Sequence, residues 1–227
     1  MLFVWCKVSF DEKRSHGSAV CETVYFFVEF VCVFPWKCVS LNNQNRGKIM
    51  DGILRKLPIG IQTFEKLREG DYLYVDKTAL VWRIASTETP YFLSRPRRFG
   101  KSLLLSTFEA YFEGKKELFE GLAIADMEKE WKTYPVFHLD LNAEKYDSPQ
   151  ALVEILSRQL TQWELKYGKG EDEETLSGRF AGVIRRASEQ ADRGVVVLVD
   201  EYDKPLLQAL DDGALLDDYR KTLKAFY

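Results

Sequence analysis

The stretch PYFLSRPRRFGKSLLLSTFEAYF, residues 90–112, decides the fold of this chain. Its apolar start, residues 91–93, predicts a short strand, and the turn that follows ends in Gly100-Lys101-Ser102. Apolar residues at helical spacing begin directly after the turn. The order strand, tight turn, helix is typical of a phosphate-binding loop, because a helix N-terminus offers unpaired N–H groups and positive dipole character to phosphate oxygens.

The turn itself has predicted chemistry. In a loop of the G-x-x-x-x-G-K-S type, Lys101 reaches the β- and γ-phosphates and the Ser102 hydroxyl binds Mg²⁺. The first glycine of that pattern would fall at position 95, where this chain has Arg95. A plain helix start, with Gly100 turning the chain and Lys101 in solvent, is the alternative interpretation.

A second stretch, residues 194–201, supplies the acidic partners that a nucleotide site needs. Five consecutive aliphatic residues, 195–199, predict a strand buried on both faces of a parallel sheet, and open α/β sheets bind ligands at the carboxyl ends of such strands. Asp200 is predicted to hold Mg²⁺, mostly through its water shell, and Glu201 to activate the attacking water as general base. Strand alternation places the two side chains on opposite sides. A core strand that ends in two surface acids is the alternative.

Composition fits a globular protein and gives little support to a dedicated nucleic-acid module. The 227 residues are 46% hydrophobic and 30% charged, with a net charge of −3. Strand and helix patterns alternate along residues 57–227, which predicts an α/β fold with a mostly parallel sheet covered by helices. Besides the two strands already named, we expect a strand at 136–141 and helices near 63–70, 77–85, 149–163 and 176–191.

Residues 1–49 differ from the rest of the chain. They contain all four cysteines, at spacings that match no zinc site, and residues 24–36 form an apolar stretch too short to span a bilayer. Nothing there forms a clean signal peptide. We therefore expect residues 1–49 to be a leader and residues 50–227, from Met50, to be the functional domain. A membrane-docking segment is the alternative for the leader.

Three motifs in order resemble the AAA-ATPase-like domain family, which occurs in many bacterial proteins of gut and oral anaerobes. They are GIQTFEKLREGDYLYVDKT at 60–78, SRPRRFGKS at 94–102 and VLVDEYDKP at 197–205. The family's loop typically reads RPRRFGKS, so Arg95 is normal there. The resemblance covers about residues 57–210 and implies a P-loop NTPase core of the additional-strand ATPase class, with ATP and Mg²⁺ as cofactors.

The resemblance also implies what lies beyond this chain. Relatives usually continue into a polar sensor strand, further helices and a C-terminal PD-(D/E)XK nuclease-like domain, whereas this chain ends at Tyr227. We therefore expect a fragment truncated at the C-terminus. Any contact with nucleic acid would come indirectly, through the missing nuclease-like domain.

The candidate site includes the whole loop. The arginines could contact phosphate oxygens or the nucleotide of a neighbouring subunit, or could be solvated. The residues expected at the nucleotide are Arg95, Arg97, Arg98, Phe99, Gly100, Lys101, Ser102 and Leu103, with Ser102 and Asp200 at the metal and Glu201 as the catalytic base. Tyr74, Asp76 and Lys77 are candidates for packing near the base, and Asp203 and Lys204 either orient the acidic pair or cap the helix that begins near Pro205.

Three functions remain open at this point. An ATPase is favoured, because Glu201 beside Asp200 suits water activation. The alternatives are a non-hydrolysing nucleotide-binding module that regulates a partner or the nuclease-like domain, and a P-loop phosphotransferase. We expect a cytoplasmic protein without a transmembrane segment, with self-association as a further expectation.

Overall fold

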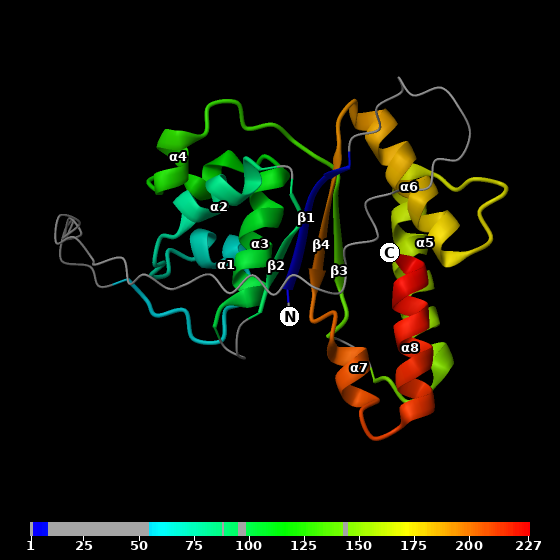
Figure 1. The fold of residues 1–227 in the computed structure, drawn as a ribbon. Coiled ribbons are helices and arrows are strands. Elements are labelled where there is room, and N and C mark those ends of the chain that lie inside the picture. The colour runs from blue at the N-terminus through cyan, green and yellow to red at the C-terminus, as the bar shows by residue number, and fades with distance from the viewer. Residues whose placement is uncertain (1, 9–54, 88, 95–98, 143–144) are drawn as a thin grey trace.

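The computed structural model describes residues 2–8, 55–87, 89–94, 99–142 and 145–227. Within them, four strands form one sheet with helices on both faces (Figure 1). The strand order is β2 (Tyr91–Leu93), β1 (Leu2–Val8), β4 (Val195–Asp200) and β3 (Val136–Asp140). An α/β fold in which β2, β4 and β3 point in the same direction agrees with the sequence prediction.

The strand β4 lies in the interior of the sheet, and each of its six residues is buried. Its parallel partner β3 is aligned so that His138 pairs with Leu198 and Asp140 with Asp200. The unbroken aliphatic run predicted this strand correctly, since burial on both faces leaves no place for the polar half of an alternating pattern. The aligned ends of β3 and β4 place Asp140 and Asp200 side by side.

The strand β1 departs from the predicted parallel arrangement. It pairs antiparallel with β2 on one side and with β4 on the other. Its residues belong to the segment 1–49 that the sequence assigns to a leader, so part of that segment lies in the sheet. The division of the chain at Met50 stays a prediction, and its test is given in the Discussion.

Five short helices cover one face of the sheet, on the left in Figure 1. They are α1 (Phe64–Glu69), α2 (Thr78–Ala85), α3 (Lys101–Phe112), the 3₁₀ helix η2 (Lys116–Phe119) and α4 (Ala123–Met127). The buried face of α3 packs on β4, which fixes the start of α3 relative to the end of that strand. The core of this layer includes Phe64, Val81, Leu105, Phe108, Phe112, Phe119, Ile124, Val196 and Leu198.

Longer helices cover the opposite face, on the right in Figure 1. They are α5 (Pro149–Tyr167), α6 (Leu176–Ala191) and α8 (Gly213–Phe226), while the short helix α7 (Lys204–Gln208) follows β4. Their core includes Phe137, Leu139, Leu152, Leu156, Leu160, Trp163, Val183, Val197, Val199 and Tyr219. The predicted helices and strands are therefore confirmed to within a few residues.

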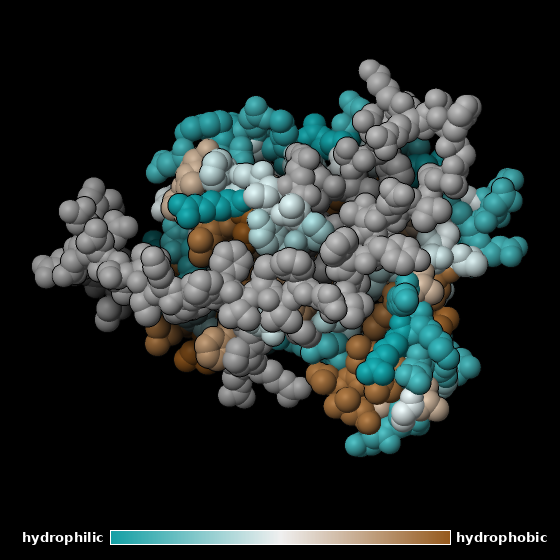
Figure 2. Space-filling model, in the orientation of Figure 1, coloured by the Kyte–Doolittle hydropathy of each residue, from teal (hydrophilic) through white to brown (hydrophobic). Residues whose placement is uncertain are grey.

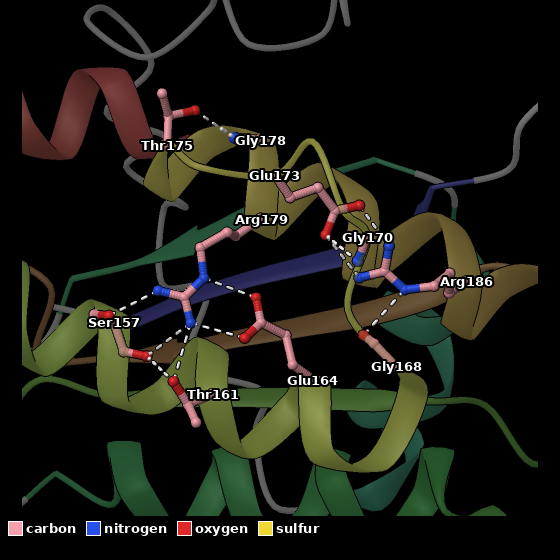
Figure 3. A network of polar contacts seen from close by, with 10 residues as sticks. All are labelled: Ser157, Thr161, Glu164, Gly168, Gly170, Glu173, Thr175, Gly178, Arg179 and Arg186. Carbon is pink, nitrogen blue, oxygen red and sulfur yellow. Dashed lines mark hydrogen bonds and ion pairs between the residues drawn. The ribbon is translucent and has the colours of Figure 1, made fainter.

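A polar network joins α5 to α6 and to the loop between them (Figure 3). The Arg179 guanidinium donates to both oxygens of the buried Glu164 carboxylate, at 2.7 and 2.8 Å, and to Ser157 Oγ at 2.7 Å. Arg186 pairs with Glu173 in the loop, with 2.9 Å between Nη2 and Oε2. Hydrogen bonds from Arg179 and Arg186 hold the pKa values of Glu164 and Glu173 below the ordinary range. The polar sequence GKGEDEE at 168–174 predicts a solvated loop, but in the structure Glu173 of this loop is held by Arg186.

Exposed apolar residues occur at several places on the molecule, among them Ile59, Val75 and Leu165. Figure 2 shows one such patch in the region of α7 and the start of α8, where Leu207 and Leu210 are exposed. Among the helices of the described residues, none has the length and apolar character needed to cross a membrane.

Candidate functional site

The site begins where β2 leads into α3. Gly100 is the N-cap of α3 and has left-handed backbone torsions, φ 73° and ψ 27°. A Cβ at this position would meet nothing within 4 Å, so the torsion and not crowding favours glycine. No side chain of the described residues forms a cap hydrogen bond with the helix. The helix begins at Lys101, directly after the turn, as the sequence predicts.

Ser102, in the first turn of α3, meets Asp200, at the end of β4. The Ser102 hydroxyl donates to Asp200 Oδ2 over 2.8 Å, across a separation of 98 residues. Asp200 is 5% exposed, and its Oδ1 is buried with no hydrogen-bond partner among the described residues. Burial raises the pKa of Asp200, the charges of Asp140 and Glu201 add to the rise, and the Ser102 hydrogen bond opposes it.

Lys101 forms an ion pair with Glu201. Lys101 Nζ lies 3.2 Å from Glu201 Oε1, with the lysine side chain 8% exposed and the glutamate 24%. Burial acts to lower the pKa of Lys101, while the hydrogen bond and charge of Glu201 and the charge of Asp203 act to raise it. A buried, fully charged ammonium at a helix N-terminus is suited to receive an anionic ligand.

The prediction that Asp200 and Glu201 lie on opposite sides is wrong. Strand alternation stops at Asp200, because Glu201 takes a left-handed conformation with φ 51°. This turn brings the Glu201 carboxylate to Lys101, so the carboxylates of Asp200 and Glu201 both contact the first turn of α3. A non-glycine residue in this region costs about 1–3 kcal/mol, a strain that is concentrated at functional sites in proteins. No local sequence signal marks such a torsion at a glutamate.

The rest of the predicted loop is only partly visible. Phe99 is 63% exposed, and Leu103 is partly buried against the core beneath α3. Arg95, Arg97 and Arg98 lie outside the described residues, so their predicted phosphate contacts stay predictions.

The candidates for the nucleotide base have structural roles. The Tyr74 ring packs edge-on against Phe64, with ring centroids 5.3 Å apart. Asp76 accepts hydrogen bonds from Thr78 N at 2.8 Å and Ala123 N at 2.7 Å, and so holds the starts of both α2 and α4. Lys77 holds the N-cap position of α2, and the Asp76 carboxylate before it accepts from the first N–H group of the helix. Packing of these residues near the nucleotide base stays a prediction.

Lys204 ties the start of α7 to the loop after β3. Its ammonium donates to the Asn142 carbonyl and lies 3.1 Å from Asn142 Oδ1. Its backbone N–H donates to the Glu201 carbonyl at 2.9 Å, which closes the turn that carries Glu201. Asp203 occupies the N-cap position of α7. Lys204 therefore stabilises the turn that presents the acidic pair.

From the sequence alone, His138 is expected to pack beside its strand and not to act as a ligand, because no Cys or His partner follows it. Nδ1 of His138 donates to Glu109 Oε2 over 3.1 Å, linking β3 to the third turn of α3. The strand register shows why the residue belongs to the site: His138 lies on the same side of β3 as Asp140, which pairs with Asp200. The place of His138 beside Asp200 can be recognised only when the pairing of β3 with β4 is known.

The residues present fit a magnesium ion. A serine hydroxyl and a carboxylate are oxygen ligands of the kind that Mg²⁺ prefers, and the two groups lie together at the start of α3. Among the described residues there is no cluster of three or more His, Cys, Asp or Glu that could hold a metal. Mg²⁺ in phosphate-binding sites does not need one, because it uses one or two protein ligands together with substrate phosphates and water.

Comparison with known proteins agrees with the resemblance noted in the sequence. Residues 58–227 match the family model described as "Predicted AAA-ATPase". The "Uncharacterized protein in vnfD 5'region" of Azotobacter chroococcum mcd 1 is 41% identical over 174 residues, which are 76% of this chain and 34% of the relative. The chain thus spans about a third of the length of this relative. No solved structure matches the chain.

Proposed function

This chain belongs to the predicted AAA-ATPase family, and on that premise we propose that it binds Mg-ATP at the turn 100–102 and hydrolyses it. The fold would then be that of a P-loop NTPase. The observation that carries the proposal is the hydrogen bond between Ser102 Oγ and Asp200 Oδ2. A hydroxyl after Gly-Lys and an acid at the end of a buried strand are the two protein groups that hold Mg²⁺ in P-loop NTPases.

Each group at the start of α3 has a part in binding. The N–H groups of the first turn and the helix dipole attract the phosphate oxygens. The buried ammonium of Lys101 neutralises charge on the β- and γ-phosphates. Ser102 and Asp200 would hold Mg²⁺, which when bound neutralises charge on the same phosphates.

In this proposal Glu201 interacts first with Lys101 and then with the attacking water. In the structure, its carboxylate is paired with Lys101. Because the phosphates compete for Lys101, binding frees Glu201 to accept a proton from the water that attacks the γ-phosphorus. Products are ADP and inorganic phosphate, and the proton passes from water to Glu201 and then to solvent. The ion pair thus links nucleotide binding to release of the base.

A non-hydrolysing nucleotide-dependent switch is the second candidate. The same ion pair favours it, since a Glu201 that stays on Lys101 would hold the site without activating water. The two candidates share the binding step and differ only in turnover.

The test measures ATP binding and ATP turnover for the same two proteins. The wild-type protein and Asp200→Asn are titrated with ATP in the presence of Mg²⁺ and in the presence of a chelator, and phosphate release is then followed. We expect the wild type to gain affinity from Mg²⁺ and Asp200→Asn to lose that gain. Phosphate release supports the ATPase, binding without release supports the switch, and a wild type that binds no ATP overturns both.

A further inference from the structure

His138 and Asp200 are neighbours on one face of the sheet. Their strands are parallel and adjacent, with His138 opposite Leu198, so Asp200 lies two residues further along β4. A strand spacing of about 4.8 Å and a rise of about 6.6 Å over two residues put the two Cα atoms roughly 8 Å apart. Both side chains lie on the side covered by α3, where Ser102 and Glu109 contact them.

Each of the two side chains has one buried polar atom without a partner. Among the described residues, His138 Nε2 and Asp200 Oδ1 have no hydrogen bond, while the second polar atom of each side chain is paired with α3. Buried polar atoms are nearly always hydrogen-bonded to protein, ligand or ordered water. The places of the two atoms on neighbouring residues are compatible with one shared partner, and a single water between them would satisfy both.

The charges around His138 favour this bridge. Burial alone would lower the pKa of His138, but the hydrogen bond and charge of Glu109, with the charges of Asp140 and Asp200, raise it overall. The groups that face the ring are thus Glu109 from α3, Asp140 from β3 and Asp200 from β4, and Lys115 acts on Glu109 from the end of α3. With Nδ1 directed at Glu109, Nε2 is the atom left to serve Asp200.

We propose that His138 is a positioning residue for Asp200, whose Oδ1 it holds through one bridging water. The inference rests on the proposed function, because the orientation of Asp200 matters there for Mg²⁺. Ser102 fixes Oδ2 and His138 fixes Oδ1, so the carboxylate cannot rotate about its Cβ–Cγ bond. Partners of this kind behind a metal ligand typically contribute 10–100-fold to metal affinity.

Two substitutions separate this role from a simple link to Glu109. In His138→Asn, the amide nitrogen lies two bonds beyond Cβ, as Nδ1 does, so the donor to Glu109 is kept and the donor near Asp200 is lost. In His138→Gln, the amide nitrogen lies three bonds beyond Cβ, as Nε2 does, so the donor near Asp200 is kept and the donor to Glu109 is lost. Each variant serves as the control for the other.

The readout is ATP affinity with Mg²⁺ and with a chelator, measured by calorimetry on the full chain, with a thermal melt to confirm folding. We expect His138→Asn to lose about 10-fold of the affinity gained from Mg²⁺, with chelator affinity unchanged, and His138→Gln to keep most of the gain. A crystal structure should show a water between Nε2 and Oδ1.

Other outcomes overturn the proposal. The reverse pattern, with only His138→Gln impaired, means that His138 acts through Glu109. Equal behaviour of the two variants removes the assignment to Nε2. A wild-type protein that binds no ATP overturns the proposed function and this inference together, whereas wild-type binding with an unimpaired His138→Asn overturns the inference alone.

Discussion

Replacing Glu201 with glutamine should tighten ATP binding while it strongly reduces turnover. The ion pair between Lys101 and Glu201 is 3.2 Å long. A triphosphate must take Lys101 away from Glu201 before it binds fully. Glu201→Gln keeps the shape of the side chain and removes the competing charge, so the nucleotide no longer has to break the pair.

The size of the effect follows from the geometry. At an effective dielectric constant of 20, two unit charges 3.2 Å apart attract by about 5 kcal/mol. Desolvation of a lysine that is 8% exposed and the ordering of both side chains offset most of that gain, and a glutamate that is 24% exposed is partly screened by solvent. We expect a net value of about 1–2 kcal/mol, which corresponds to roughly 5–30-fold tighter binding. Loss of the general base should reduce turnover by about 10²–10⁴-fold.

The assay is calorimetric titration of both proteins with Mg-ATP, together with phosphate release at saturating ATP. Glu113→Gln is the matched control, because Glu113 pairs with Lys115 at the far end of α3 and the substitution changes net charge equally. It should leave affinity and turnover unchanged. Unchanged or weaker binding by Glu201→Gln would refute the competition for Lys101, and undiminished turnover would refute the role of Glu201 as base.

Three further predictions test other parts of the structure. Ser102→Ala should bind Mg-ATP about tenfold more weakly than wild type and bind ATP equally well in chelator, and equal Mg-ATP affinity would remove Ser102 from the metal site. Arg179→Met leaves the buried Glu164 carboxylate unpaired and should cost about 3 kcal/mol in urea unfolding at pH 7. Arg179 holds the pKa of Glu164 below its ordinary 4.5, so the stabilisation from this pair is present above pH 4.5 and is lost as the pH falls further. The free energy of unfolding of the variant should therefore fall less steeply below pH 4.5 than that of the wild type. A protein that begins at Met50 should still fold and bind ATP but melt at a lower temperature, since β1 bonds to both β2 and β4, and the absence of a cooperative melt would make residues 1–49 part of the domain.

Much of the fold could be predicted from local patterns. The aliphatic run before Asp200 predicted a fully buried strand, and the Gly100 turn predicted the start of α3. The position of β1 could not be predicted, because pairing between strands that are far apart in sequence leaves no periodic signal in either strand. The antiparallel strand therefore appears only in the structure.

The sequence predicted which residues form the candidate site, and the structure corrected how their side chains are arranged. The two motifs predicted that Ser102 and Asp200 belong to one site, and a hydrogen bond joins their side chains in the structure, while their roles at a metal stay predictions. The alternation of side chains between the two faces of a strand does not extend to Glu201. It holds only within a strand, and Glu201, the residue after the end of β4, takes a left-handed conformation. His138 was missed since its role depends on the register of β3 against β4 and on its contact with α3.

The most direct test of the central claim is the affinity of Lys101→Ala for Mg-ATP, measured by calorimetry beside the wild type. Lys115→Ala serves as control, because Lys115 is another lysine of the same layer whose partners are Glu65 and Glu113. We predict that the wild type and Lys115→Ala bind Mg-ATP and that Lys101→Ala, although folded, does not. Unchanged affinity in Lys101→Ala would contradict a phosphate site at the start of α3.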